Sequence, residues 1–264
     1  MTRMITTHEP FTAAAGIPVD GLPPDTTVER MPLADGGAFE LALVAIPATD
    51  AASHDAVVAE LVGRGSSWAA AATPGCDPPL VVPLYGTHVI WSPHRGVAVA
   101  PGDRLPAMRA AVVDFVDREA ELRDIERRVA AALERVDGDA ALAFEFDEPS
   151  LPRKRELAGR FREAISLRRR LAILAPLLRQ PTPQPPTLAG QVGERLRDRG
   201  RVGERLEHAV EQADLLERVY AGCGDRVAEF VASRRHATLE WVIILLLVAE
   251  VVLLAVDLLA MHAS

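Results

Sequence analysis

A long apolar stretch near the carboxyl end limits the folds open to this chain. Residues 239–261 read LEWVIILLLVAEVVLLAVDLLAM, and about 20 apolar residues cross the hydrocarbon core of a bilayer as a helix. The runs 242–249 and 251–256 are apolar on every side, whereas a surface helix of a globular domain has one apolar face. A buried amphipathic helix is the alternative, and it fits this pattern less well. We therefore expect a transmembrane anchor at 239–261.

The residues around the anchor predict its orientation. Arg234, Arg235 and His236 precede it and only 262–264 follow it, and basic residues collect on the cytoplasmic side of a membrane. The first ten residues lack the apolar core of a secretory signal. Of the 29 basic residues only Lys154 is a lysine, a bias typical of GC-rich bacterial genomes. We expect a single-pass protein of the inner (cytoplasmic) membrane of a bacterium, with its body in the cytoplasm.

Carboxylates inside the anchor predict self-association. Glu240 and Asp257 lie near its ends and can reach water, but Glu250 lies near its middle. A carboxyl group in hydrocarbon is costly, and burial favours its neutral form. A hydrogen bond to a neighbouring helix is the simplest way to satisfy it, so we expect a homo-oligomer. A proton relay is the alternative, but one carboxylate on one span provides no path for a proton.

Charge and cysteine content exclude several classes of protein. The chain has 37 acidic and 29 basic residues and a net charge of −8. Non-specific binding of nucleic acid depends on neutralising phosphates, so this acidic balance argues against a protein that coats nucleic acid. Its two cysteines, Cys76 and Cys223, are far apart and no C-x-x-C occurs, which argues against a disulfide framework and a thiolate metal site. An apolar content of 49% is sufficient for a sizeable core, and Cys223 is expected in that core.

Patterns along the chain predict an α+β fold. A strand is expected from Phe39, and short apolar runs between residues 80 and 100 alternate with turn residues as in hairpins. The predicted organisation, in chain order, is a proline-rich flexible lead-in at 1–36, an α+β domain at 37–104, a helical hairpin at 105–180, a proline hinge at 181–187, a coiled-coil stalk at 188–238 and the transmembrane anchor at 239–261.

Helical periodicity dominates the second half of the chain. Apolar residues recur every three or four positions over 108–136 and again over 157–178, which predicts two long amphipathic helices that pair. Between them, 140–146 is expected to be a loop rather than a strand. A nearly heptad stripe at 206–230 leads into the anchor, so we expect one continuous helix over 204–261 whose stripe forms a coiled coil.

One segment is strongly basic: residues 151–180 contain nine basic and two acidic residues. One interpretation pairs this helix with the acidic residues at 114–126 of its neighbour. A second interpretation is that the helix binds RNA, a ribosome or anionic lipid headgroups, because the planar guanidinium of arginine binds phosphate. A third is that it binds an acidic protein. Phe161 is the only aromatic residue in the segment, so base stacking is not supported. The candidate contact residues are Arg153, Lys154, Arg155, Arg160, Arg162, Arg168, Arg169 and Arg170.

No motif of a known catalytic site occurs in the sequence. Glycine-rich phosphate-binding loops, the metalloprotease pair H-E-x-x-H and the nucleophile elbow G-x-S-x-G are absent. His88, His94 and Asp103 could form a metal or catalytic cluster at a predicted turn, although histidines at hairpin tips are usually solvated. We predict no catalytic, cofactor-binding or metal-binding residue and no cofactor.

The junction between stalk and anchor resembles that of a known family. The residues RRHATLEWVII at 234–244, followed by Ala249, Glu250 and Val251, resemble the signature ending of the required-for-meiotic-nuclear-division family. The bacterial members are called YagE-like, and the domain has no assigned function. The resemblance extends over about residues 39–258, and the chain departs from the family at 179–187, which lacks the family's tryptophan.

The resemblance implies a membrane-anchored protein without an established catalytic activity. The family's mitochondrial members reside in the inner membrane, form homo-oligomers and support organellar translation. We therefore expect a self-associating scaffold or adaptor that supports translation or tethers ribosomes at the membrane. The residues carried over are the anchor signature, Leu239, Glu240, Trp241 and Glu250.

A membrane-bound enzyme or ligand-binding protein with a pocket in the α+β domain is the alternative. Such a protein is expected to show a concave cluster of polar groups near His88, His94 and Asp103. A scaffold is expected to show a flat or grooved surface there instead.

Overall fold

The chain folds into two compact units in a computed structural model that describes residues 12–14, 21–33, 36–48, 50–72, 78–179 and 187–263. The sheet unit comprises 1–128 and 169–210, and the bundle unit comprises 129–168 and 211–264. The predicted hinge at 181–187, apart from Thr187, lies outside the described residues, as does Cys76.

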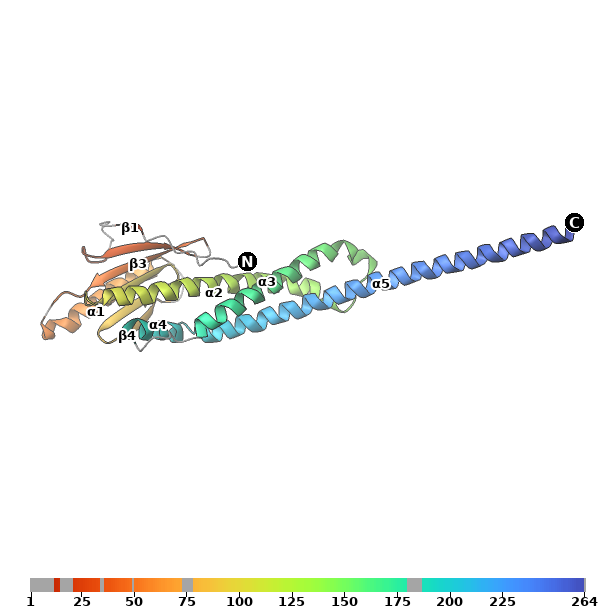
Figure 1. The fold of residues 1–264 in the computed structure, drawn as a ribbon. Helices are drawn as coiled ribbons and strands as arrows, with labels where there is room; N and C mark the ends of the chain where they lie inside the picture. Colours follow the sequence, from red (N-terminus) through yellow and green to blue (C-terminus); the bar gives the residue numbers. More distant parts are fainter. Residues whose placement is uncertain are drawn as a thin grey trace. The chain divides into compact units, whose positions relative to one another are not determined.

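A mixed sheet forms the centre of the sheet unit (Figure 1). Its strands are β1 (Thr12–Ala14), β2 (Thr27–Pro32), β3 (Ala38–Ala45), β4 (Leu80–Leu84), β5 (Thr87–Trp91) and β6 (Arg95–Ala100). Among the described residues the strand order is β1-β2-β3-β6-β5-β4, with β3 and β6 parallel and the other neighbours antiparallel. The predicted strand from Phe39 and the hairpin strands between 80 and 100 are confirmed.

Strands β1 and β2 correct part of the prediction of a flexible lead-in at 1–36, of which 1–11, 15–20 and 34–35 lie outside the described residues. Strand β2 pairs with β3 in antiparallel register, from Thr27 opposite Leu43 to Pro32 opposite Ala38. This pairing buries Met31 and leaves its neighbours more exposed, which is the alternation of a strand with one face in a core. The prolines around β2 concealed this short alternating pattern.

Helix α1 (Ala51–Ala70) covers one face of the sheet and packs against β5 and β6. Alternate strand residues such as Val44 share a buried cluster with Leu61 of the helix, because successive side chains of a strand point to opposite faces. Gly65 permits the close approach: a Cβ at this position would lie 2.9 Å from Cδ1 of Ile90.

Helices α2 (Leu105–Asp139) and α4 (Leu188–Arg199) also pack on the strands. The rings of Trp91 on β5 and Phe115 on α2 meet edge to face with centroids 5.3 Å apart, and α4 contacts β4. Helix α4 is capped by Gly200, and a new helix begins at Val202. The predicted stalk at 188–238 is therefore wrong at its start, because α4 covers the sheet instead.

The bundle unit contains segments of three helices. They are the end of α2, the start of α3 (Lys154–Arg179), and most of α5 (Val202–Ala263), an unbroken helix of 62 residues (Figure 1). Two short 3-10 turns, η1 (Ala140–Ala143) and η2 (Glu148–Arg153), connect α2 to α3. The predicted helical pair and the absence of a strand at 140–146 are confirmed.

The predicted coiled-coil stripe of α5 is buried inside the chain. In the bundle unit its buried residues are Ala213, Leu216, Tyr220, Cys223 and Val227, at the three- and four-residue spacing of one helix face. Phe146, in the connection between α2 and α3, packs its ring against Phe230, with centroids 5.8 Å apart. The continuous helix is therefore confirmed, and its stripe has partners within the chain; a coiled coil is not shown.

Candidate functional site

The carboxyl-terminal part of α5 exposes a long run of apolar side chains. Large hydrophobic residues from Leu239 to Leu253 are all exposed, and Trp241 reaches 68% exposure. The helix is long and apolar enough to cross a membrane, and none of its most apolar stretch is buried by the rest of the chain. Glu240 and Glu250 are exposed on the same segment. Contiguous apolar surface of this extent marks an interaction site.

Five basic residues of the basic segment have acidic partners. In the sheet unit, Arg170 contacts Asp124 and Glu121 of α2, and Arg179 lies 4.0 Å from Glu207. In the bundle unit, Arg168 contacts Asp214 and Glu217 of α5. Arg153 and Arg160 both contact Asp139, at the end of α2, and Glu156, in the first turn of α3. The predicted seam with the acidic residues at 114–126 of α2 therefore forms only through Arg170, and the other partners come from α5, from the end of α2 and from α3 itself.

Glu119 and Glu126 of that predicted seam are bound by α5 rather than by α3. Arg205 of α5 contacts both carboxylates, at 3.0 Å and 2.6 Å. Burial alone would lower the pKa of Arg205, but hydrogen bonds and charge from Glu126 and Glu119 raise it above its ordinary value. This ion pair therefore joins α5 to α2 within the sheet unit.

The remaining basic residues are exposed. Lys154, Arg155 and Arg162 in the bundle unit, and Arg169 in the sheet unit, are exposed on α3. Among the described residues these four make no salt bridge within 4.0 Å, although Arg162 donates to the carbonyl of Ala158 at 3.1 Å. Of the eight candidate contact residues, these four are the ones whose charge is open to a partner.

A buried carboxylate holds the bundle unit together. Asp139, at the end of α2, is 0% exposed and accepts hydrogen bonds or ion pairs from Arg153 and Arg160. The Tyr220 hydroxyl donates to Oδ2 of Asp139 at 3.2 Å, and the Cys223 thiol lies 3.7 Å from the Asp139 carbonyl oxygen. One side chain thereby contacts residues from η2, α3 and α5. Burial raises the pKa of the Cys223 thiol, so this cysteine is a core residue and a weak nucleophile.

The residues predicted as a possible polar cluster do not come together. His88 lies near the start of β5 and His94 in the turn after its end, so they are at opposite ends of this strand. Asp103 follows β6, at the end of the sheet that carries His88. No group of three or more histidine, cysteine or acidic residues able to hold a metal ion occurs in the described part of the chain.

We expect His88 to make the stability of the protein depend on pH. Nδ1 of His88 is buried without a hydrogen-bond partner among the described residues, and burial lowers the pKa of His88 below its ordinary 6.5. As the pH falls below about 6.5, His88 takes up a proton in the unfolded chain before it does so in the folded protein. The free energy of unfolding therefore decreases below that pH, by up to about 1.4 kcal/mol per pH unit. Urea midpoints of the full chain in mild detergent should show this slope.

The variant His88→Phe should flatten this pH slope, because the side chain no longer titrates. The exposed His94→Gln is the control and should keep it. An equal slope in wild type and His88→Phe would contradict the assignment.

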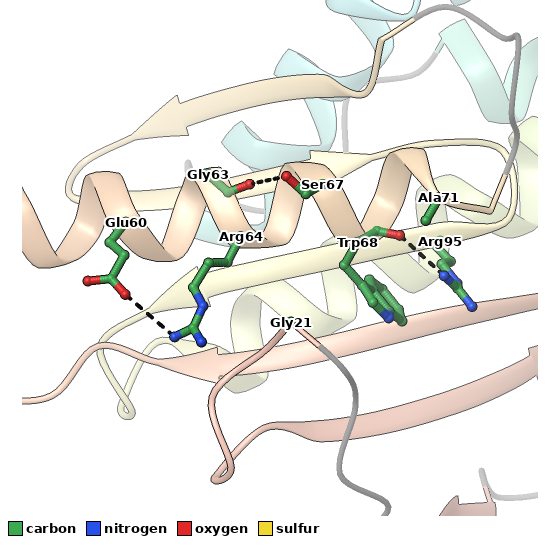
Figure 2. Close-up of a pocket in the computed structure, with 8 residues that line it drawn as sticks. All are labelled: Gly21, Glu60, Gly63, Arg64, Ser67, Trp68, Ala71 and Arg95. Atoms are coloured by element: carbon green, nitrogen blue, oxygen red, sulfur yellow. Dashed lines mark hydrogen bonds and ion pairs between the residues drawn. The ribbon is translucent and has the colours of Figure 1, made fainter.

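A pocket lies in the sheet unit beside α1, and His88, His94 and Asp103 are not among its lining residues. It has a volume of about 790 Å³ and is lined by Gly21, Glu60, Gly63, Arg64, Ser67, Trp68, Ala71 and Arg95. Figure 2 shows the α1 residues in a row along the helix, with Gly21 on a loop opposite and Arg95 beside Trp68. Sequence reasoning missed this pocket, although small residues at positions 63, 67 and 71 share one helix face.

Comparisons of the chain with family models, with curated proteins and with solved structures find no match.

Proposed function

We propose that this protein is a membrane-anchored, self-associating scaffold or adaptor. The observation that carries the proposal is the continuity of α5. Its buried stripe, from Ala213 to Val227, belongs to the bundle unit, and the same helix then runs without a break into the exposed apolar stretch from Leu239 onward. Because α5 is continuous, the anchor and the folded unit are joined by helix rather than by a loose linker.

The proposed orientation places the folded units in the cytoplasm of a bacterium. Arg234, Arg235 and His236 are exposed and immediately precede the apolar stretch, which is the side on which basic residues are retained. Arg234 also contacts Glu148 of η2. This ion pair puts η2 close to the level at which α5 would enter the membrane.

The later basic residues of α3 are far from that level, whereas Lys154 and Arg155 directly follow η2. Tyr220, which shares Asp139 with Arg160, precedes Leu239 by 19 positions, about 28 Å of helix at 1.5 Å per residue. Glu217, which pairs with Arg168, is about 33 Å from Leu239. Electrostatic attraction is screened beyond about 10 Å at physiological salt. For the stretch from Arg160 to Arg168, which includes the exposed Arg162, this spacing argues against the lipid headgroups of the anchoring membrane and favours RNA, a ribosome or an acidic protein as the partner.

Self-association is proposed through the apolar end of α5. The heptad stripe at 213–227 is covered within the chain, so the exposed apolar segment around Glu250 is the part of α5 that is open to a second copy. A neutral carboxyl group in hydrocarbon gains from a hydrogen bond to a neighbouring helix. The resemblance to the required-for-meiotic-nuclear-division family supports the same proposal and adds support of translation as the purpose of the assembly.

The mass of the detergent-extracted complex tests this function. The wild type should run at a multiple of the 28.4 kDa chain, and Glu250→Leu should run as a smaller species, because its interhelical hydrogen bond is lost. Glu240→Leu is the matched control: the same substitution near the end of the stretch, where the carboxylate reaches water, should keep the wild-type mass.

RNA and proteins that copurify with the complex are identified in the same sample. Ribosomal components that leave the complex at high salt would support a ribosome tether. A wild-type monomer would contradict self-association, and failure to sediment with ribosomes at both low and high salt would contradict the tether.

A further inference from the structure

The pocket beside α1 has the dimensions of a small-molecule site. Its volume of about 790 Å³ lies within the range of about 300–1,000 Å³ that is usual for such sites. Its lining combines the Trp68 indole and small residues with the charged groups of Glu60, Arg64 and Arg95. A mainly apolar wall with a few polar groups is the usual composition of a ligand site.

Gly63 leaves the pocket open. A glycine inside a helix is less favourable than alanine, and α1 contains two of them. At Gly65 packing explains the glycine, since a Cβ would lie 2.9 Å from Ile90 and 3.2 Å from Val97. At Gly63 a Cβ would meet nothing within 4 Å, so packing does not explain it. A side chain at 63 would instead enter the pocket that this residue lines.

Arg95 presents a fixed cationic group to the pocket. Its Nε donates to Glu40 at 2.8 Å, its Nη1 donates to the Trp68 carbonyl at 3.2 Å, and its guanidinium carbon lies 4.6 Å from the centre of the Trp68 ring. These contacts hold the planar guanidinium in one orientation, as the dashed bond to Trp68 in Figure 2 illustrates. A preoriented arginine fork suits carboxylate and phosphate oxygens.

Arg64 supplies a second cation that can change partners. It contacts Glu60 one turn earlier at 3.5 Å, with both side chains well exposed, and an exposed ion pair of this kind contributes little to stability. An anion in the pocket can therefore replace Glu60 at little cost. Glu60 is the only carboxylate among the described residues that line the pocket, and Glu40, outside the lining, pairs with Arg95.

We propose that this pocket binds a small organic anion, with its carboxylate, sulfonate or phosphate group at Arg64 and Arg95 and its apolar body against Trp68 and Gly63. This site is separate from the apolar end of α5, so its test is independent of the proposed anchoring and self-association.

Calorimetric titration of the full chain in nanodiscs of neutral phosphatidylcholine tests the proposal. The probes are phenyl phosphate and naphthalene-1-sulfonate, benzyl alcohol is the neutral analogue, and heats from empty nanodiscs are subtracted. We expect saturable binding of at least one anion, and binding of benzyl alcohol at least tenfold weaker. If neither anion gives saturable heat, or if benzyl alcohol binds as tightly as the anions, the proposal is wrong.

Three variants locate the binding. Gly63→Leu fills the pocket and should weaken anion binding at least tenfold, and Arg64→Gln should weaken it several-fold. Gly159→Leu is the matched control, because Gly159 is also a helical glycine with nothing near its absent Cβ, but it lies in the bundle unit; it should bind as the wild type does. Leucine is the better helix former, so circular dichroism should show retained helix in both leucine variants. Equal affinities of the two leucine variants would also overturn the proposal.

Discussion

Replacing Asp139 by alanine should destabilise the bundle unit by about 3–5 kcal/mol, because the change leaves buried positive charge without its partner. The Asp139 carboxylate is fully buried and contacts Arg153 and Arg160. The Arg160 side chain is only 18% exposed, so it cannot turn freely into water. The Tyr220 hydroxyl loses its acceptor as well. We expect amide hydrogen exchange to accelerate at the end of α2, in η2 and at the start of α3.

Two other variants of the same cluster calibrate the loss. Glu156→Ala removes a carboxylate that also contacts Arg153 and Arg160 but is half exposed, and such pairs contribute about 0–1 kcal/mol. Tyr220→Phe removes one hydrogen bond, for which about 1 kcal/mol is expected. If Asp139→Ala is no more harmful than Glu156→Ala in urea midpoint and exchange rates, the buried carboxylate does not hold the helices together.

The helix α5 shows which part of the fold was readable from the sequence. Its unbroken period and the lack of proline predict one long helix, and this prediction is confirmed. The partner of its stripe was not readable, because a three- and four-residue spacing is the same whether the stripe packs on a second chain or on the helices of its own chain. Here the end of α2 and the connection to α3 provide contacts within the chain, such as Asp139 with Tyr220 and Phe146 with Phe230, and a coiled coil is not shown.

Long-range ion pairs were the least readable feature. The acidic residues of α2 and the basic residues of α3 predicted a seam between these two helices, but Arg205 of α5 binds Glu119 and Glu126. Asp139 lies in a polar stretch, Asp137 to Asp139, that resembles a solvated helix end. Its partners come from positions 14 and 81 residues later in the chain. Local periodicity carries no information on such partners.

The pocket was missed for a related reason. Arg95 comes from β6 and Gly21 from the loop before β2, so the site exists only after the sheet and α1 have packed. The one local signal is Gly63, a glycine inside a helical pattern, and it could have been noticed because helix interiors disfavour glycine. The histidines attracted notice by their chemistry, but the strand between them keeps them apart.

Two arginines in the middle of the apolar stretch should abolish membrane association. Val248 and Val252 are exposed apolar residues on either side of Glu250, and an arginine near the centre of a span costs about 2.5–3.5 kcal/mol on insertion scales. The double variant Val248→Arg/Val252→Arg should therefore lose about 5–7 kcal/mol of insertion free energy. The arginines are two positions from Glu250, so neither lies at the three- or four-residue spacing that would pair it with this carboxylate. We expect the protein to move from the carbonate-resistant membrane fraction to the supernatant.

The matched control places the same charges on exposed apolar positions outside the stretch. Ile165 and Leu215 are 44% and 43% exposed in the bundle unit, and Ile165→Arg/Leu215→Arg adds the same two charges to the chain. The proposal places the bundle unit in water, where added charge on the surface is tolerated. The control should therefore stay in the membrane fraction, because its apolar stretch is unchanged. Release of both double variants would mean that added charge alone detaches the protein. Retention of both would mean that residues 239–253 do not enter hydrocarbon, and it would remove the physical basis of the anchor.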